Sequence, residues 1–256
     1  MWRRILAILL LLACEAQAAG VYTEADETTQ LVCLRAEDGT RLTDYIYSDV
    51  IPCGNGWILC RDGKYGAVNG ALEELVPFEY TYLAARGTDE YLALKSEIYD
   101  ELPDELYYIN RNGYCAATGV TLFYAVPALD SPEEAYLSAE TGRWGYLDFT
   151  GQWRIAPEYI AAGSFVDGMA AVYTEEGAGV INFNGDYIIE PEYSQICLNG
   201  VAIVGLKDGV ADVFTRDSEG CALLGEYAAR YACLNADMVT LYGTEVVELS
   251  ICDCED

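Results

Sequence analysis

The feature that most constrains how this chain folds is an internal repeat. Residues 142–159 read GRWGYLDFTGQWRIAPEY, and the same order of residue types returns one step further along the chain. Gly145 corresponds to Gly179, a step of 34 residues. A fixed period of about 20 to 50 residues is typical of repeat architectures, in which each copy is one small structural unit. We therefore expect an array of similar units.

Further copies extend the array in both directions. One contains Tyr65-Gly66-Ala67-Val68-Asn69 followed by Pro77-Phe78-Glu79-Tyr80, and weaker copies flank it. Aligned on the glycine of the Trp-Gly pair, the full and partial copies fall at positions 33, 66, 107, 145, 179, 211 and 243. The array then covers residues 30–251 as one repeat domain of about six units.

Each copy has the pattern of short strands joined by tight turns. Trp144, Tyr146 and Asp148 alternate with Gly145 and Leu147, which is the period-two pattern of a strand. Glycine then supplies the positive φ of a hairpin turn. A second strand is expected to end at the proline, because proline cannot donate to a sheet ladder. With a third strand each unit has three strands, and neighbouring units must stack to bury them.

The residues that recur are interpreted as parts of this construction. A tryptophan ring can fill the space between units, and the following glycine leaves room for it or for a neighbouring backbone. A catalytic carboxylate normally occurs once, so repeated glutamates are expected to make repeated structural contacts. The predicted structural residues are Tyr65, Gly66, Trp144, Gly145, Gly151, Pro157, Glu158, Tyr159, Gly179, Gly185, Pro191, Glu192 and Tyr193. No catalytic, cofactor-binding or metal-binding residue is predicted.

The motif resembles the bacterial WG-repeat (KWG) family. Its units read roughly W-G-[YF]-[IL]-[DN]-x-x-G-x-x-x-[IV]-x-P-x-[YF], followed by a glycine-led apolar strand. Residues 142–172 match closely, 176–204 well and 63–80 in part. The resemblance implies an all-β repeat array in a protein that is exported or held at the cell surface, and it implies no shared catalytic residues.

Two arrangements of the units remain open. A β-propeller-like ring is favoured, with a final strand over Gly243–Ile251 completing the first unit. An open β-solenoid is the alternative, and it needs polar caps at both ends. Two stretches depart from the repeat, the acidic residues 96–106 and residues 127–140, and both are expected to form loops. Chemistry that is unique to one unit should be found where the units differ.

The N-terminus has the order of an export signal. Arg3 and Arg4 precede an apolar run, and Ala16-Gln17-Ala18 follows it, so residues 1–18 are expected to be removed. Alternatively, Leu11-Leu12-Ala13-Cys14 resembles a lipobox, in which case Cys14 carries a lipid anchor. Both routes place the chain outside the cell or on its surface. A short linker over 19–29 and an acidic tail over 252–256 complete the predicted organisation.

Composition excludes several classes of function for this chain. The net charge is −28 and there is no histidine, which argues against nucleic-acid binding and excludes histidine-dependent catalysis and metal sites. Of the ten cysteines, nine keep a thiol in either mature form, because Cys14 is removed or lipidated; these nine are expected to be small buried residues or to form one or two disulfides. We expect a non-enzymatic module that binds a protein or a glycan, with no cofactor. The alternative is an exported, carboxylate-based glycoside hydrolase.

Overall fold

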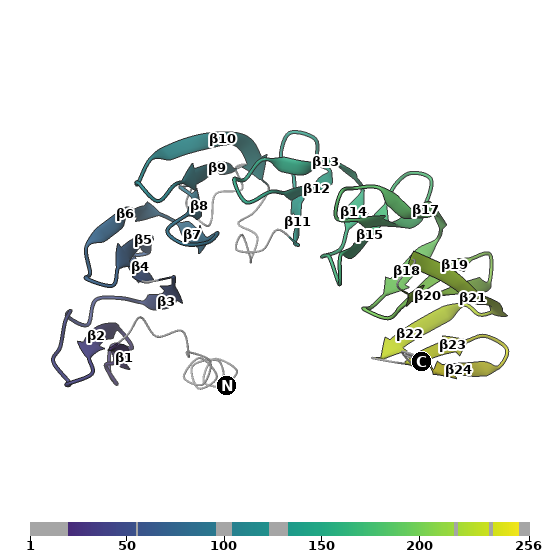
Figure 1. Cartoon of the computed structure of the whole chain (residues 1–256), viewed down its shortest axis with the longest axis horizontal. Helices are drawn as coiled ribbons and strands as arrows, with labels where there is room; N and C mark the ends of the chain where they lie inside the picture. Colours follow the sequence, from purple (N-terminus) through teal and green to yellow (C-terminus); the bar gives the residue numbers. More distant parts are fainter. Residues whose placement is uncertain are drawn as a thin grey trace. The chain divides into compact units, whose positions relative to one another are not determined.

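The computed structural model describes residues 20–54, 56–95, 104–122, 133–217, 220–235 and 238–250. The expected export signal with Cys14 and the acidic tail 252–256 lie outside these residues, as do most of the predicted loop 96–106 and the first half of the loop 127–140. Every regular element in the described residues is a β-strand (Figure 1). The described residues contain no helix that is long and apolar enough to cross a membrane.

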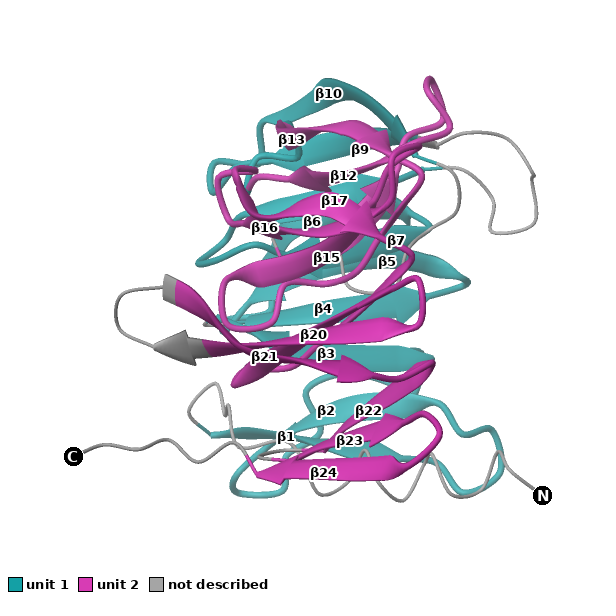
Figure 2. Cartoon of the chain, turned by 90° about the vertical axis from the view of Figure 1, so that its right-hand side faces the viewer, with its two compact units in different colours: residues 1–131, 149–152 teal, residues 132–148, 153–256 magenta. Residues whose placement is uncertain are grey.

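The chain forms two compact units (Figure 2). Unit 1 comprises residues 1–131 and 149–152, and unit 2 comprises residues 132–148 and 153–256. Within each unit, consecutive strands pair antiparallel into small sheets, which we call A to G in chain order. The all-β repeat array is therefore confirmed.

Unit 1 holds sheets A, B and C. Their strands are β1 (Val21–Ala25) and β2 (Val32–Ala36) in A; β3 (Asp49–Cys53), β4 (Gly56–Arg61), β5 (Lys64–Asn69) and β6 (Glu74–Tyr80) in B; and β7 (Tyr82–Ala85), β8 (Tyr91–Leu94), β9 (Asp104–Ile109) and β10 (Cys115–Leu122) in C.

Unit 2 holds sheets D to G. Their strands are β11 (Ala135–Leu137), β12 (Trp144–Leu147) and β13 (Trp153–Tyr159) in D; β14 (Ala161–Ala162), β15 (Met169–Tyr173), β16 (Ala178–Asn182) and β17 (Tyr187–Tyr193) in E; β18 (Gln195–Leu198), β19 (Ala202–Lys207), β20 (Val210–Asp217) and β21 (Gly220–Ala228) in F; and β22 (Tyr231–Asn235), β23 (Met238–Tyr242) and β24 (Val246–Ser250) in G.

The sequence repeat and the sheets are out of phase. A copy that starts at Trp144 contributes β12 and β13 to sheet D and then β14 and β15 to sheet E. Each full sheet has four strands, because a first strand of two to five residues was missed. The expectation of three strands per unit is corrected accordingly, since strands this short carry no readable alternation.

The Trp-Gly glycine makes room for a bulge in the neighbouring strand. Trp144 pairs with Tyr159 and Tyr146 pairs with Ile155, so Gly145 alone faces three residues of β13. A Cβ atom on Gly145 would lie 2.6 Å from the carbonyl oxygen of Ile155. Gly179 meets Ile189 at the same distance, and Gly66 lies 2.8 Å from Val76 by the same measure. The glycine is therefore required by the approach of a backbone.

This bulge also corrects the expected role of the prolines. Pro157 and Pro191 were predicted to end their strands, yet β13 and β17 continue through them to Tyr159 and Tyr193. Both strands lie at the edge of their sheet, where a missing N–H costs no ladder hydrogen bond. The strand register also shifts the alignment of one weak copy by one residue. Ala211 pairs with Tyr227 as Trp144 pairs with Tyr159, so Ala211 is equivalent to the tryptophan and Asp212 to the glycine.

Successive sheets bury their apolar faces against one another. In unit 1, Leu34 of sheet A packs with Trp57 of sheet B, and Tyr80 of sheet B packs with Tyr91 of sheet C. In unit 2, separate clusters join D to E, E to F and F to G. Each interface is the packed core that a single sheet cannot form alone, as the stacking of repeats requires.

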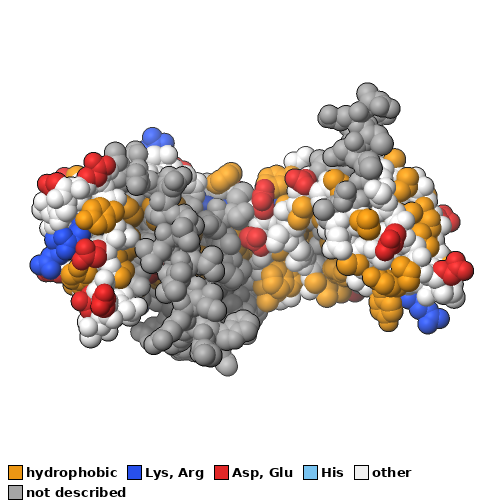
Figure 3. Space-filling model, turned by 90° about the horizontal axis from the view of Figure 1, so that it is seen from below, with side chains coloured by type: hydrophobic (Ala, Val, Ile, Leu, Met, Phe, Trp, Pro, Cys, Tyr) orange, Lys and Arg blue, Asp and Glu red, His pale blue; other side chains and the backbone are white. Residues whose placement is uncertain are grey.

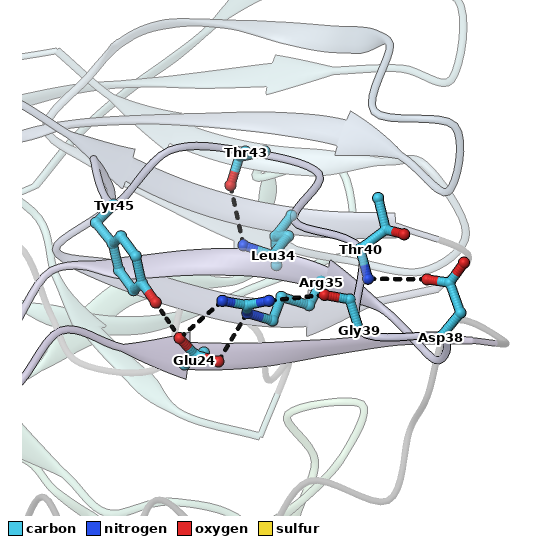
Figure 4. Close-up of polar contacts among 8 residues, drawn as sticks. All are labelled: Glu24, Leu34, Arg35, Asp38, Gly39, Thr40, Thr43 and Tyr45. Atoms are coloured by element: carbon cyan, nitrogen blue, oxygen red, sulfur yellow. Dashed lines mark hydrogen bonds and ion pairs between the residues drawn. The ribbon is translucent and has the colours of Figure 1, made fainter.

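The N-terminal part of the array is held by a polar cluster (Figure 4). Residues 19–29 were expected to be a linker, but β1 lies within them and pairs with β2. Arg35 of β2 forms an ion pair with Glu24 of β1, with 2.7 Å between Nε and Oε2, and Tyr45 donates a hydrogen bond to the same carboxylate. The bond from Tyr45, together with Arg35, holds the pKa of Glu24 below its ordinary value. The hairpin is thus tied to the loop that follows it.

Three other expectations are settled by the strand pairing. The stretch 127–140 is not all loop, because it includes β11. Residues 246–250 pair with β23 as the last strand of sheet G. The described cysteines form no disulfide with one another; Cys33 and Cys60 are buried as expected, whereas Cys115 and Cys233 are exposed. Closure into a ring remains a prediction.

Candidate binding site

Three equivalent junctions allow the repeats to be compared residue by residue. We call the passage from the last strand of one sheet to the first strand of the next a junction. At junctions B–C, D–E and E–F the residue after the repeated tyrosine donates its N–H to a carbonyl near the end of the second strand. The bonds are Thr81 to Leu94 (2.9 Å), Ile160 to Tyr173 (2.8 Å) and Ser194 to Leu206 (2.8 Å).

The same bond occurs at junctions A–B and F–G, from Ser48 to Cys60 and from Arg230 to Tyr242 (2.8 Å each), but only B–C, D–E and E–F have a glutamate two residues before the donor. At each of the three junctions the residue before the repeated tyrosine is a glutamate: Glu79, Glu158 and Glu192. One residue after the accepting carbonyl stands Lys95, Thr174 or Lys207. Two junctions therefore have a lysine opposite the glutamate, and the D–E junction has a threonine.

At the B–C junction the lysine binds the glutamate and two rings. Lys95 Nζ lies 2.8 Å from Glu79 Oε1, and 5.0 and 5.2 Å from the ring centres of Tyr80 and Tyr107. The hydrogen bond with Lys95 lowers the pKa of Glu79, and the same bond raises the pKa of Lys95. The site is an anionic and aromatic seat for one ammonium group.

The E–F junction repeats the ion pair. Lys207 Nζ lies 2.9 Å from Glu192 Oε2, and this bond raises the pKa of Lys207. Tyr193 beneath it is buried and donates a hydrogen bond of 2.8 Å to Asp212. The repeated glutamate thus bridges two successive sheets at both junctions.

The D–E junction has the same frame without the lysine. Thr174 bonds within its own turn, donating to the Gly177 carbonyl and accepting from the Glu176 N–H. Glu158 is exposed, and among the described residues no ion pair joins it to a lysine or arginine. Arg143, the residue before β12, forms an ion pair with Glu175, with 2.6 Å between Nη2 and Oε1. The place of the ammonium group is therefore left to solvent.

Negative charge and an exposed ring surround this open place. Tyr187 of β17 is 38% exposed. Partial burial raises the pKa of its phenol, and the charges of Glu158, Glu190 and Glu176 raise it further, so three carboxylates lie near one ring. Tyr159 is buried beside them, and burial raises its pKa to about 12. The phenols of Tyr159 and Tyr187 therefore stay neutral at physiological pH.

A second departure at the same junction adds an apolar side chain. At the B–C and E–F junctions the first residue has a hydroxyl that donates to the accepting carbonyl, as Thr81 does to Leu94 (3.2 Å) and Ser194 to Leu206 (2.6 Å). The D–E junction has Ile160, which is 47% exposed. Ile188 on β17 is also exposed. Figure 3 shows one face of the molecule, on which acidic and hydrophobic side chains are both exposed.

Unit 1 offers a different candidate, an apolar cavity of about 250 Å³. It lies between β3 and β7, each of which is the first, edge strand of its sheet. Ile51, Cys53 and Leu83 line it, and Ile51 is exposed. Burial raises the pKa of the Cys53 thiol, so this thiol is a poor nucleophile. Edge strands beside an apolar cavity suit an extended polypeptide.

The pKa shifts of the described carboxyls bear on the alternative of a glycoside hydrolase. Each carboxyl whose pKa is shifted is shifted downward, by hydrogen bonds and ion pairs; these are Glu24, Asp26, Asp38, Glu79 and Glu175. A glycosidase needs one carboxyl whose pKa is raised. The described residues also contain no cluster of three or more metal-ligating side chains.

The predicted repeat residues lie at the bulges, turns and junctions. Tyr65, Trp144, Gly66, Gly145 and Gly179 are on the second-to-last strand of a sheet, and Gly151 and Gly185 are in turns with φ of 79° and 91°. Pro157, Glu158, Tyr159, Pro191, Glu192 and Tyr193 are on the last strand of a sheet. Sequence reasoning missed Ile160, Thr174 and Tyr187. A spacing signal existed, because Lys95 follows Gly66 by the same 29 residues as Thr174 follows Gly145.

Comparison with known proteins identifies one repeat. A family model described as a WG containing repeat matches residues 144–176, so the chain contains a WG repeat there. No curated protein matches the chain. The remaining copies rest on the sheet register described above.

Solved structures show only weak likeness. They include Hsv2 of Kluyveromyces lactis with its complete loop 6CD, at a TM-score of 0.38 and 8% identity over 81% of this chain and 83% of that chain. The AfRom2 CNH domain has a TM-score of 0.35 and 8% identity over 90% and 93%. Apo AztD from Citrobacter koseri has a TM-score of 0.33 and 10% identity over 91% and 79%. The fold assignment therefore rests on the strand pairing itself.

Proposed function

We propose that this chain is an exported, non-enzymatic binding module that presents a repeat surface to a polypeptide partner. The observation that carries the proposal is the exposed D–E junction. There Ile160, Tyr187 and Ile188 present apolar and aromatic surface among carboxylates, in a frame whose equivalents elsewhere are closed by the chain's own lysines. Exposed apolar surface rimmed by polar groups is typical of protein interaction sites.

The test compares two surfaces of one protein. The mature chain and the variants Ile160→Asp and Ile51→Asp are used to capture partners from a cell-surface extract, with each variant checked for the same thermal unfolding midpoint. We expect one reproducible protein band that Ile160→Asp removes and Ile51→Asp leaves. Loss with Ile51→Asp alone would move the site to the cavity between β3 and β7. No difference among the three proteins would contradict the proposal.

A glycan is the second candidate partner. Tyr114 and Tyr231 are 67% and 69% exposed, and flat exposed rings are stacking faces for sugars. Competition separates the two candidates, because soluble surface oligosaccharides should leave capture by a polypeptide site unchanged. Removal of the captured band by oligosaccharide, together with its loss in Tyr114→Ala or Tyr231→Ala, would favour the glycan.

Export is proposed from the leader alone. Residues 1–18 have the charge, apolar core and small-residue order of an export signal, and Cys14 follows a lipobox-like stretch. Intact-mass measurement of the mature chain tests both routes. A chain starting at Ala19 indicates release, whereas a chain starting at a lipid-modified Cys14 indicates an anchor on the cell surface. A chain that retains Met1 contradicts export.

A further inference from the structure

The molecule itself shows what occupies the seat formed by the repeated glutamate and tyrosine. At the B–C junction the occupant is the ammonium group of Lys95, held by Glu79 and lying over the ring of Tyr80. At the E–F junction it is the ammonium group of Lys207, held by Glu192. Two independent copies of one frame thus select the same chemical group, a primary ammonium on a flexible chain.

The D–E junction keeps the seat and lacks the occupant. Glu158 and Tyr159 stand where Glu79 and Tyr80 stand, and the backbone bond from Ile160 to Tyr173 fixes the same geometry. Thr174 is too short to span to Glu158, and its hydroxyl is already bonded within its turn. Glu158, Glu176 and Glu190 all raise the pKa of the Tyr187 phenol, as Asp212, Glu192 and Glu226 do for Tyr193 at the E–F junction.

The surroundings favour a lysine within a polypeptide over a free amine. Ile160, two residues after Glu158 in the chain, is 47% exposed, and Ile188, the neighbour of Tyr187, is 36% exposed. A small amine would leave these side chains in water, whereas the residues that flank a lysine in an extended segment can cover them. A net charge of −28 also draws basic segments towards the chain before they dock.

We propose that the D–E junction binds the ammonium group of a lysine from a partner polypeptide, seated between Glu158 and Tyr187 in the place that Lys95 takes at the B–C junction. The inference rests on the proposed function and names its chemistry. The partner supplies in trans the cation that two other junctions supply in cis. Apolar neighbours of that lysine cover Ile160 and Ile188.

The first test uses a defined probe. A fluorescent peptide Val-Thr-Leu-Lys-Leu-Thr-Val is titrated into the mature protein by anisotropy, next to the same peptide with N-acetyl-lysine or with arginine. We expect the lysine peptide to bind at least about tenfold more tightly than the acetylated one, which corresponds to about 1.4 kcal/mol. Equal binding of the two peptides would overturn the proposal. Tighter binding of arginine would replace lysine by arginine as the ligand.

The second test fills the seat from within. Thr174→Lys places a lysine at the position equivalent to Lys95 and Lys207, so it should compete with the probe and weaken its binding about tenfold. Thr174→Gln, which adds length without charge, should leave binding unchanged. Glu158→Gln should weaken binding as much as Thr174→Lys, and Glu192→Gln, at a junction already closed, should have no effect. Unchanged binding by Thr174→Lys would contradict the proposal.

The third test separates the seat from general attraction to an acidic protein. The probe lysine is dimethylated with ¹³C, which keeps its charge, and its methyl resonances are followed on binding. Seating against the tyrosine rings predicts a ring-current shift that Tyr187→Leu reduces and that 150 mM salt preserves. A small amine, n-butylammonium, should displace the probe only at far higher concentration. Binding without a shift, abolished by salt, would mean a diffuse attraction and no seat.

These outcomes distinguish the inference from the function on which it rests. Partner capture that Ile160→Asp removes but Thr174→Lys and Glu158→Gln leave intact keeps the polypeptide site and rejects the lysine. If none of the three variants loses partner capture, both the polypeptide site at this junction and the lysine ligand are rejected.

Discussion

The B–C and D–E junctions are built from the same parts, yet one is closed by Lys95 and the other is open at Thr174. Both have the glutamate, the buried tyrosine and the backbone bond that anchors the first residue of the junction. The frame therefore forms without the ion pair. Exposed ion pairs contribute little to stability, so loss of a lysine costs the fold little and leaves a charged seat at the surface. A repeat can in this way give up one structural contact and gain a binding position.

The largest expected effect tests whether the two junctions share their backbone. Gly66→Ala, Gly145→Ala and Gly179→Ala should each destabilise the protein by about 2–3 kcal/mol, because the new Cβ meets a carbonyl oxygen at 2.6–2.8 Å. Gly163→Ala is the control, since its Cβ would lie 3.7 Å from the nearest atom, a carbonyl oxygen. Urea unfolding measures the change. A Gly145→Ala variant as stable as Gly163→Ala would break the equivalence of the junctions.

The next effect concerns the buried tyrosines, which differ between junctions. Tyr193 donates to Asp212 at 2.8 Å, so Tyr193→Phe should cost about 1 kcal/mol. Among the described residues the hydroxyl of Tyr159 has no such partner, so Tyr159→Phe should change the free energy of unfolding by less than about 0.5 kcal/mol. Thermal unfolding of the two variants side by side is the measurement. Equal losses would show that the open junction holds its tyrosine by a bond of the same strength.

A smaller effect is expected when the B–C junction is opened and the D–E junction is closed by substitution. Lys95→Met opens the B–C seat and should destabilise by about 0.2–1 kcal/mol, while Thr174→Lys closes the D–E seat and should stabilise by a similar amount. A double-mutant cycle of Thr174→Lys with Glu158→Gln isolates the new pair from other consequences of the substitution. If Glu158→Gln has no influence on the gain from Thr174→Lys, the added lysine does not reach that glutamate.

The sequence predicts the construction unit better than the way units are joined. Alternation around Trp144 and the glycine turns predicts strands correctly, because those signals are local. It cannot show that β13 ends one sheet and β14 begins the next, since pairing partners leave no mark on periodicity. The bulge opposite Gly145 was missed for the same reason. Proline is read as a stop, although at an edge strand it costs nothing.

The candidate site is recognised by comparing equivalent positions in successive repeats, and the sequence alone identifies only some of these positions. Glu158 and Glu192 are equivalent by motif. The residues opposite them, Thr174 and Lys207, lie at the end of the second strand of the next sheet, and their distance from the motif along the chain differs by one residue. Lys207 follows Gly179 by 28 residues, whereas Thr174 follows Gly145 by 29. The bonds to Tyr173 and Leu206 remove this ambiguity. The absence of a lysine at one repeat becomes visible only when strand ends, rather than motif spacings, are aligned.

The smallest effect is a pH dependence that only the closed junction should show. Its hydrogen bond with Lys95 lowers the pKa of Glu79 below the ordinary value of 4.5. A lowered pKa in the folded state means that the pair's contribution is complete above pH 4.5 and is lost as the pH falls through the lowered value. Both side chains are well exposed, so a few tenths of a kcal/mol are expected. Comparing unfolding at pH 6 and pH 3.5, Glu79→Gln should remove a small part of the acid destabilisation. Lys95→Met, which removes the cation and keeps the carboxylate, should remove a similar part, and a Lys95→Met variant with the full acid destabilisation of the parent would show that the ion pair is not its source.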